Sequence, residues 1–272
     1  MAVTELLDGV WLHTSGRAMT TTTVLALGEH DCMVVDPAME PSDLDEIAAL
    51  VRELGLTVTL GWSTHPHWDH ILWSSQLGAD VVRFATRQNA QLCAAELGKV
   101  EAYLEKECPG HETGLCGRLT PLEDGERRWP TSCRVIAHDA HAPGHGALWV
   151  QEKGLLIAGD MVSDIEIPTL DLESSQPVGA YEEALDRYEG IAQEVVIFVP
   201  GHGAPGDATE LRRRIAIDRR YLAGLVSGRP VPDDGRRAEQ WLQAQHELQV
   251  AWCVDHYRDG HEGPNRVPGY EP

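Results

Sequence analysis

The chain has 272 residues, of which 42% are hydrophobic and 24% are charged, as in an ordinary globular protein. Its 43 acidic residues outnumber its 22 basic residues, and the net charge of −21 argues against nucleic-acid binding, which depends on lysine and arginine contacts to phosphate. No stretch approaches the roughly 18 apolar residues of a membrane span. We therefore expect neither a nucleic acid nor a membrane as a partner.

The N-terminal nine residues contain neither the basic segment nor the apolar segment of a secretory signal. The six cysteines are scattered along the chain without a CxxC pair, and such cysteines are typically reduced thiols. We therefore expect a cytoplasmic protein.

Strand and helix signals alternate along the first 205 residues, which is typical of an α/β fold. Apolar runs around a polar turn indicate hairpins, and apolar residues at helical spacing indicate helices. In chain order, the sequence predicts short strands within 10–36 that include a hairpin at 24–36, a helix at 42–54 capped by Ser42, a strand at 57–62, a strand at 80–84, a helix at 86–107, a strand at 135–137, a hairpin at 147–158, a helix at 178–191 and a strand at 195–199.

The pattern changes after residue 206. Residues 207–226 and 236–257 are charged and helical and carry no strand signals. We therefore predict an α/β domain at 1–206, followed by a helical C-terminal extension and tail at 207–272. The last residues, from 259 on, are rich in Gly and Pro and predict a poorly ordered tail or a strap.

Ligand-type side chains are concentrated in the loop His65-Pro66-His67-Trp68-Asp69-His70, which directly follows the predicted strand at 57–62. Neutral imidazole and carboxylate are common zinc ligands, and α/β sheets place ligand sites at the carboxyl ends of strands. One tetrahedral ion cannot comfortably bind four groups from adjacent positions. Either some of the four are bystanders, or two metal ions share the loop.

Three later strand ends also carry ligand-type side chains, and each lies beside Gly or Pro. These side chains are His141 and His145, then Asp160, and finally His202. Glycine and proline allow the sharp bends that would direct such side chains toward a common centre. Together with the loop at 65–70, they predict a metal site.

These segments resemble the motifs of the metallo-β-lactamase-fold hydrolase superfamily, over roughly residues 5–205. Residues 65–70 resemble its HxHxDH motif, 142–146 its PGH segment, 158–160 its strand ending in Gly-Asp, and 200–203 its final GHG. The resemblance implies a four-layered αββα sandwich with a helical C-terminal extension. It differs at Gly146, where the family often has Thr or Ser.

The resemblance also implies two metal ions per chain, taken as zinc, with iron and manganese as alternatives. One ion would bind His65, His67 and His145, the second would bind Asp69, His70 and His202, and Asp160 would bridge both. Because it follows Pro-Gly as in the family pattern, His145 is preferred to His141 as the ligand. His138 and His141 are then expected to lie next to the metal ligands or the substrate.

The implied chemistry is hydrolysis by a metal-bridging hydroxide, which Asp69 would orient and whose proton it would pass on. Three positions argue against other branches of the superfamily. Asp160 is absent from true β-lactamases, Ser163 stands where the lactonases often have Tyr, and His67 stands where the flavoprotein relatives have Glu. The prediction is a glyoxalase II-like or thioesterase-like enzyme that cleaves a carboxylic ester or thioester of a small organic acid.

Three other functions stay open: a phosphodiesterase with the same dinuclear site, a mononuclear iron dioxygenase that oxidises persulfides, and a metal-binding regulator without turnover. The expected partner is a small-molecule substrate, and a homodimer is compatible with the helical extension. The segment 108–130 is a hypothetical lid. Trp62, Trp68 and Trp73 are either packing residues or an apolar wall for the substrate.

Overall fold

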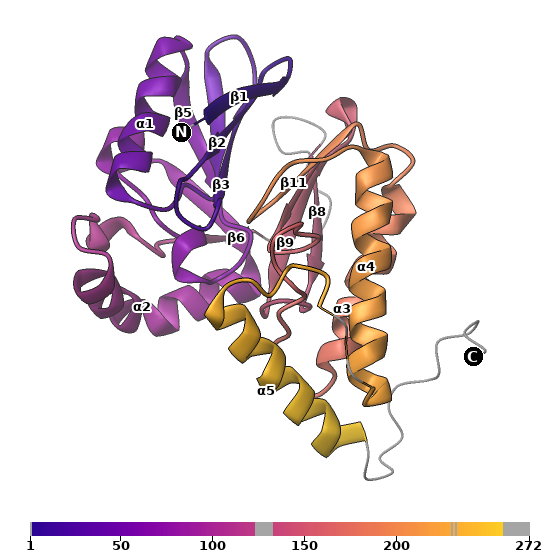
Figure 1. Cartoon of the computed structure of the whole chain (residues 1–272). Coiled ribbons are helices and arrows are strands. Elements are labelled where there is room, and N and C mark those ends of the chain that lie inside the picture. The colour runs from indigo at the N-terminus through magenta and orange to yellow at the C-terminus, as the bar shows by residue number, and fades with distance from the viewer. Residues whose placement is uncertain (1, 123–132, 230, 232, 258–272) are drawn as a thin grey trace.

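Two β-sheets pack face to face and helices cover their outer faces, as Figure 1 shows. The computed structural model describes residues 2–122, 133–229, 231 and 233–257. The first sheet has the order β1 (Ala2–Leu7), β2 (Val10–Thr14), β3 (Thr21–Ala26), β4 (Asp31–Val35), β5 (Thr57–Trp62), β6 (Val82–Thr86) and β7 (Thr120–Leu122). The second has the order β11 (Ile197–Pro200), β10 (Leu155–Gly159), β9 (His145–Val150) and β8 (Cys133–His138).

Five α-helices complete the described fold: α1 (Pro41–Glu53), α2 (Arg87–Glu107), α3 (Pro177–Ile191), α4 (Ala208–Ser227) and α5 (Gln240–Tyr257). In Figure 1, α1 and α2 lie outside the first sheet, whereas α3 and α4 lie outside the second. None of the helices in the described part of the chain is long and apolar enough to cross a bilayer.

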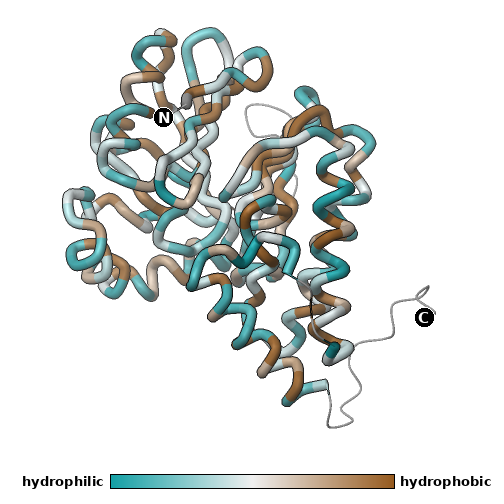
Figure 2. The backbone as a smooth tube through the Cα atoms, in the orientation of Figure 1, coloured by the Kyte–Doolittle hydropathy of each residue, from teal (hydrophilic) through white to brown (hydrophobic). Residues whose placement is uncertain are grey.

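Three apolar clusters hold these layers together. The central cluster joins the two sheets, for example through Met33 of β4 and Leu148 of β9. The second cluster packs the first sheet against α1 and α2, and the third packs the second sheet against α3, α4 and α5. Figure 2 accordingly shows pale and brown strands inside, and helices α4 and α5 that alternate between teal and brown. The predicted four-layered αββα sandwich with a helical C-terminal extension is confirmed.

The strand directions bring the predicted site residues to one edge. Strands β4, β5 and β6 run parallel to one another, and β10 runs parallel to β11. Parallel strands end at the same edge of a sheet, where α/β folds place their ligand sites. The loops that follow β5, β10 and β11 therefore converge.

Most predicted elements are present within a few residues of their expected bounds. The predicted cap Ser42 is wrong, because Pro41 is already the first residue of α1 and Glu40 is its N-cap. One carboxylate oxygen of Asp43 accepts hydrogen bonds from the backbone N–H groups of Glu40, at 2.9 Å, and Met39, at 3.1 Å. The edge strands β1 and β7 were not predicted, since β7 is only 3 residues long and neither carries a strong apolar run.

The predicted lid at 108–130 is only partly described, because residues 123–132 lie outside the described residues, as does the predicted tail at 259–272. Cys108 and Cys116 are buried in the apolar cluster beneath α1 and α2. Glu112 accepts hydrogen bonds from the side chain of Ser74, at 3.1 Å, and from the backbone of Ser75, at 2.8 Å. The described part of this segment is therefore fastened to the first half of the fold.

Candidate metal centre

The predicted ligands meet where the two sheets face each other. The loop that begins at His65 follows β5, Asp160 follows β10, and His202 follows β11. His141 lies in the loop between β8 and β9, whereas His145 is the first residue of β9. Two groups of side chains form there: the second is buried throughout, whereas the first combines two buried histidines with a half-buried Asp160 and an exposed His67.

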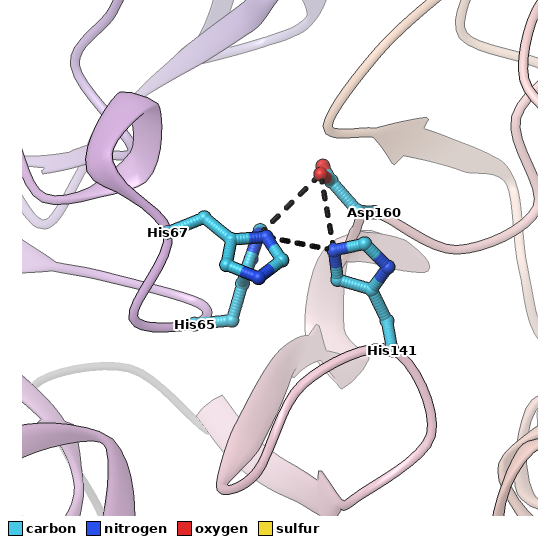
Figure 3. Close-up of side chains that lie close together, drawn as sticks. All are labelled: His65, His67, His141 and Asp160. Atoms are coloured by element: carbon cyan, nitrogen blue, oxygen red, sulfur yellow. Dashed lines mark hydrogen bonds and ion pairs between the residues drawn. The ribbon is translucent and has the colours of Figure 1, made fainter. Parts of the chain in front are cut away.

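The first group contains His65, His67, His141 and Asp160, which approach from both halves of the chain in Figure 3. The Nδ1 atom of His67 lies 3.1 Å from Nε2 of His65 and 3.0 Å from Nε2 of His141. The Oδ2 atom of Asp160 lies 3.4 Å from Nε2 of His65 and 3.5 Å from Nε2 of His141. Ligands at about 2.0–2.1 Å from a tetrahedral zinc ion are separated by about 3.4 Å, so this spacing fits one four-coordinate cation.

His145 lies beside this group rather than in it. Its ring stacks on His65, with centroids 5.1 Å apart, and on His138, with centroids 4.4 Å apart. Both ring nitrogens of His145 are buried and have no hydrogen-bond partner among the described residues. The β9 backbone directs this side chain against Gly159, where an added Cβ would lie 2.4 Å from His145 Nε2. Among the described residues, the cluster that could hold a metal ion therefore contains His141 and not the predicted His145.

The second group contains Asp69, His70 and His202. Asp69 Oδ2 lies 3.2 Å from His202 Nε2 and 3.5 Å from His70 Nε2, and the two imidazole nitrogens are 3.4 Å apart. Asp160 also approaches this group, with Oδ1 at 3.1 Å from His70 Nε2 and Oδ2 at 3.4 Å from His202 Nε2. One carboxylate thus faces both groups, as the sequence predicts for a bridging ligand.

Hydrogen bonds behind the ligands fix their orientation. Asp36, which follows β4, accepts hydrogen bonds from the backbone N–H of Thr64 at 2.8 Å and from its hydroxyl at 2.6 Å. The Oδ2 atom of Asp36 also lies 3.0 Å from His70 Nδ1. Such outer contacts determine which ring nitrogen of a histidine is left to bind a metal. The sequence analysis did not single out Asp36, although its position at the end of a parallel strand is the signal that it shares with Asp160.

Two backbone carbonyl oxygens orient His202 and His141 in the same way. His202 Nδ1 lies 3.1 Å from the carbonyl oxygen of Ala18. His141 Nδ1 lies 3.1 Å from the carbonyl oxygen of Thr169 and 2.6 Å from its hydroxyl. In each ring, Nε2 is the nitrogen that faces the ligand groups.

The electrostatics of the two groups differ. Burial is the main cause that lowers the pKa of His65, His67 and His141, that of His141 to about 3, so these rings are neutral at pH 7. Burial also opposes a charge on His70 and His202, but nearby carboxylates, Asp160 first, outweigh it and raise the pKa of both rings. In the absence of metal, protons on these two histidines offset the negative charge of the carboxylates. A bound cation would offset the same charge. The donor set fits metal ions.

Four further positions from the sequence have structural roles. The hydroxyl of Ser163 donates a hydrogen bond to the carbonyl oxygen of His202 at 2.8 Å. The indole N–H of Trp62 donates to the carbonyl oxygen of Gly146 at 2.9 Å, and Trp62 and Trp73 are buried packing residues. A Cβ on Gly146 would lie 2.6 Å from Cγ2 of Thr86, so Thr or Ser would not fit there without a shift.

A family model described as the Metallo-beta-lactamase superfamily matches residues 132–202. The matched range includes His141, His145, Asp160 and His202, but not the loop that begins at His65. The chain is also similar to a metallo-beta-lactamase type 2 from Bacteroides fragilis, with 23% identity over 229 residues, 82% of this chain and 87% of the relative.

Solved structures share the fold. A beta-lactamase domain protein from Burkholderia ambifaria superposes with a TM-score of 0.63 and 21% identity, covering 93% of this chain and 88% of that chain. The protein TTHA1623 in a di-iron-bound form has a TM-score of 0.58 and 23% identity, covering 75% of this chain and 97% of that chain.

Proposed function

We propose that this chain, which belongs to the metallo-β-lactamase superfamily, is a hydrolase that works with two adjacent metal ions. The observation that carries this proposal is the position of Asp160. Its two carboxylate oxygens lie within 3.1–3.5 Å of ligand nitrogens from both groups. A lone metal would not require two such groups around one buried carboxylate.

In this proposal, His65, His67 and His141 bind one metal, Asp69, His70 and His202 bind the other, and Asp160 binds both. When bound, the two ions would lower the pKa of a shared water and so supply a nucleophile at neutral pH. The imidazole and carboxylate donors suit zinc, and they also suit iron or manganese.

Asp69 is the proposed catalytic carboxylate. Burial alone would raise its pKa, but the positive charges of His70 and His202 outweigh burial and lower it, so Asp69 is ionised. An ionised carboxylate accepts hydrogen bonds without donating any. Asp69 can therefore hold the attacking water by one of its protons and fix the direction of attack.

The edge of the site supports an ester or thioester of an organic acid as the substrate. Trp68 lies between the ligands His67 and Asp69 in the chain, and its ring packs against Tyr103 with centroids 5.5 Å apart. The guanidinium of Arg17 lies 5.5 Å from the centre of the Trp68 ring, its Nη1 atom donates a hydrogen bond to Oε1 of Glu40 at 2.8 Å, and its side chain is 46% exposed. This exposed cation beside an aromatic surface, which a substrate carboxylate would share with Glu40, favours a substrate with a carboxylate and an apolar acyl group.

The test is a substrate panel combined with metal analysis. Protein purified without added metal is assayed on nitrophenyl esters, thioesters, bis(nitrophenyl) phosphate and a persulfide. We expect about two metal ions per chain, hydrolysis of esters or thioesters, loss of activity with a chelator and recovery with zinc. One iron ion with persulfide oxidation, or hydrolysis of the phosphodiester alone, would contradict the proposal. Full activity of Asp160→Ala would show that the bridging carboxylate is not needed.

A further inference from the structure

The C-terminal helix α5 makes a direct polar contact with the loop that follows β10. Gln249 of α5 is fully buried, and its Oε1 atom accepts a hydrogen bond from the backbone N–H of Leu170 at 2.7 Å. Its Nε2 atom donates to the hydroxyl of Tyr221 in α4 at 2.8 Å. The Tyr221 hydroxyl in turn lies 3.0 Å from Nδ1 of His246. The amide of Gln249 is therefore held on one side by the helices and on the other by the loop.

The contacted residue adjoins the metal centre. Leu170 follows Thr169, whose carbonyl oxygen and hydroxyl lie 3.1 Å and 2.6 Å from Nδ1 of His141. Because the carbonyl accepts a hydrogen bond from Nδ1–H, Nε2 of His141 is left with a lone pair and faces His67 at 3.0 Å. An unbroken series of contacts thus runs from α5 to a ligand of the first metal.

The extension holds the same loop at a second point. Arg236, which lies between α4 and α5, donates from Nη1 to the carbonyl oxygens of Glu166, at 3.1 Å, and Ser163, at 3.4 Å. Its charge is balanced by Asp218 at 2.6 Å, and both side chains are buried. Since Ser163 also donates to the backbone of His202, this second contact lies next to a ligand of the other metal.

A helix that served only as a brace would not need Gln249. Apolar residues such as Leu242 and Cys253 already join α5 to the core. Burying an amide is costly unless both of its ends are hydrogen-bonded. Residues 161–176 form neither helix nor strand, so their backbone N–H groups need partners from other parts of the chain. Gln249 supplies one such partner, at Leu170, which is the residue after Thr169, whose carbonyl oxygen orients His141.

We propose that Gln249 is a positioning residue, through which the C-terminal extension holds Thr169 and thereby orients His141 toward the first metal. The extension would then be part of the metal centre rather than an appendage to it. This inference rests on the proposed function to the extent that it takes His141 as a ligand.

The decisive variant is Gln249→Leu, which keeps the volume and removes the acceptor. Zinc affinity is measured for each of the two equivalents by competition with a chelator, and the melting temperature is measured without metal. We expect one equivalent to bind about 10- to 100-fold more weakly, as when an outer contact of a metal ligand is lost. The cobalt-substituted protein should also show an altered visible spectrum.

Tyr221→Phe is the matched control, because it disrupts the same buried network but keeps the bond from Gln249 to Leu170. We expect it to lower the melting temperature while both zinc affinities stay unchanged. If the two variants lose zinc affinity in proportion to their loss of stability, Gln249 is a brace and the proposal is wrong. If Gln249→Leu does not fold, Gln249→Asn withdraws the acceptor while keeping the side chain polar, and the same result is expected.

Two further variants, Thr169→Val and His141→Ala, distinguish a failure of this inference from a failure of the proposed function. Thr169→Val removes the hydroxyl contact to His141 Nδ1 at 2.6 Å, keeps the contact from the backbone carbonyl and does not touch α5. Because Gln249 is proposed to act through Thr169, combining Thr169→Val with Gln249→Leu should weaken zinc binding by less than the sum of the single losses. Additive losses would contradict the series of contacts. If His141→Ala still binds two zinc ions with unchanged affinity, it is the ligand assignment in the proposed function that fails.

Discussion

Replacing Asp36 with asparagine should weaken one of the two metal sites, because the proton of the neutral His70 ring would move from Nδ1 to Nε2. An amide has a single acceptor oxygen, and the backbone N–H of Thr64 requires an acceptor at the position of Asp36 Oδ1, 2.8 Å away. The NH₂ group of the substituted side chain would then face His70 Nδ1, at the position of an oxygen that now lies 3.0 Å away. His70 would have to place its proton on Nε2, the nitrogen that faces Asp69 and His202.

The expected loss of zinc affinity follows from the hydrogen bond between Asp36 and His70 that is lost. A hydrogen bond to a charged group contributes about 1.5–3 kcal/mol, and about 1.4 kcal/mol is tenfold in an equilibrium constant. We therefore expect Asp36→Asn to weaken one zinc equivalent about 10- to 100-fold, in line with other losses behind a metal ligand. The other equivalent should change less, because Asp36 contacts the first group indirectly, through the hydroxyl of Thr64, which lies 3.0 Å from Nδ1 of His65.

The assay is competition between the protein and a fluorescent zinc chelator, fitted with two sites. Asp43→Asn is the control, because Asp43 is also a buried carboxylate and accepts hydrogen bonds from Ser15 at 2.6 Å and Glu40 at 2.9 Å. Asp43 contacts none of the proposed ligands among the described residues, so its variant should lose stability but keep both affinities. Unchanged zinc binding by Asp36→Asn would refute the assigned orientation of His70.

Three further outcomes are expected. His141→Ala should bind only one zinc ion tightly and lose activity, whereas His145→Phe, which keeps a ring between His65 and His138, should still bind two. Metal titration measures both, and loss of a zinc ion in His145→Phe but not in His141→Ala would restore His145 as the ligand. Arg17→Ala should raise KM at least several-fold for esters that carry a carboxylate and leave neutral esters unchanged, and equal effects on both would remove Arg17 from substrate recognition. Burial lowers the pKa of His138 to about 3, so the unfolded chain, with a histidine pKa of about 6.5, binds a proton that the fold excludes. The contribution of His138 to the stability of the metal-free protein is therefore full well above pH 6.5 and is lost toward pH 3, and His138→Gln should remove about 2 kcal/mol of the loss between pH 7.5 and 5 in urea unfolding. An unchanged pH dependence would show that His138 carries a proton in the fold.

The fold and most of the clustered side chains could be predicted because both depend on local signals. Apolar runs and turn residues specify the strands, and candidate ligands such as Asp160 and His202 follow within two residues of a strand end. The choice between His141 and His145 could not be made in this way. It depends on the direction that β9 gives to its first side chain, and on packing against Gly159, a residue 14 positions away in the sequence.

Contacts behind the ligands were harder still to predict. Asp36 and His70 are 34 positions apart, and Gln249 and Leu170 are 79 positions apart. Nothing in the local sequence of Gln249 distinguishes it from the exposed glutamine at Gln243 in the same helix. Only the packing of α5 on the loop after β10 makes one of them a partner of the metal centre.

The ligands of each proposed metal come from both sheets. In the second group, His70 follows a strand of the first sheet and His202 follows a strand of the second, and the two rings are 132 positions apart in the chain. Bound ions would therefore cross-link the two halves much as a disulfide does, but reversibly. Without bound metal, this seam would open more often and be cut by proteases more readily. The lifetime of the protein would then follow the supply of its metal, so that copies unable to act are removed first.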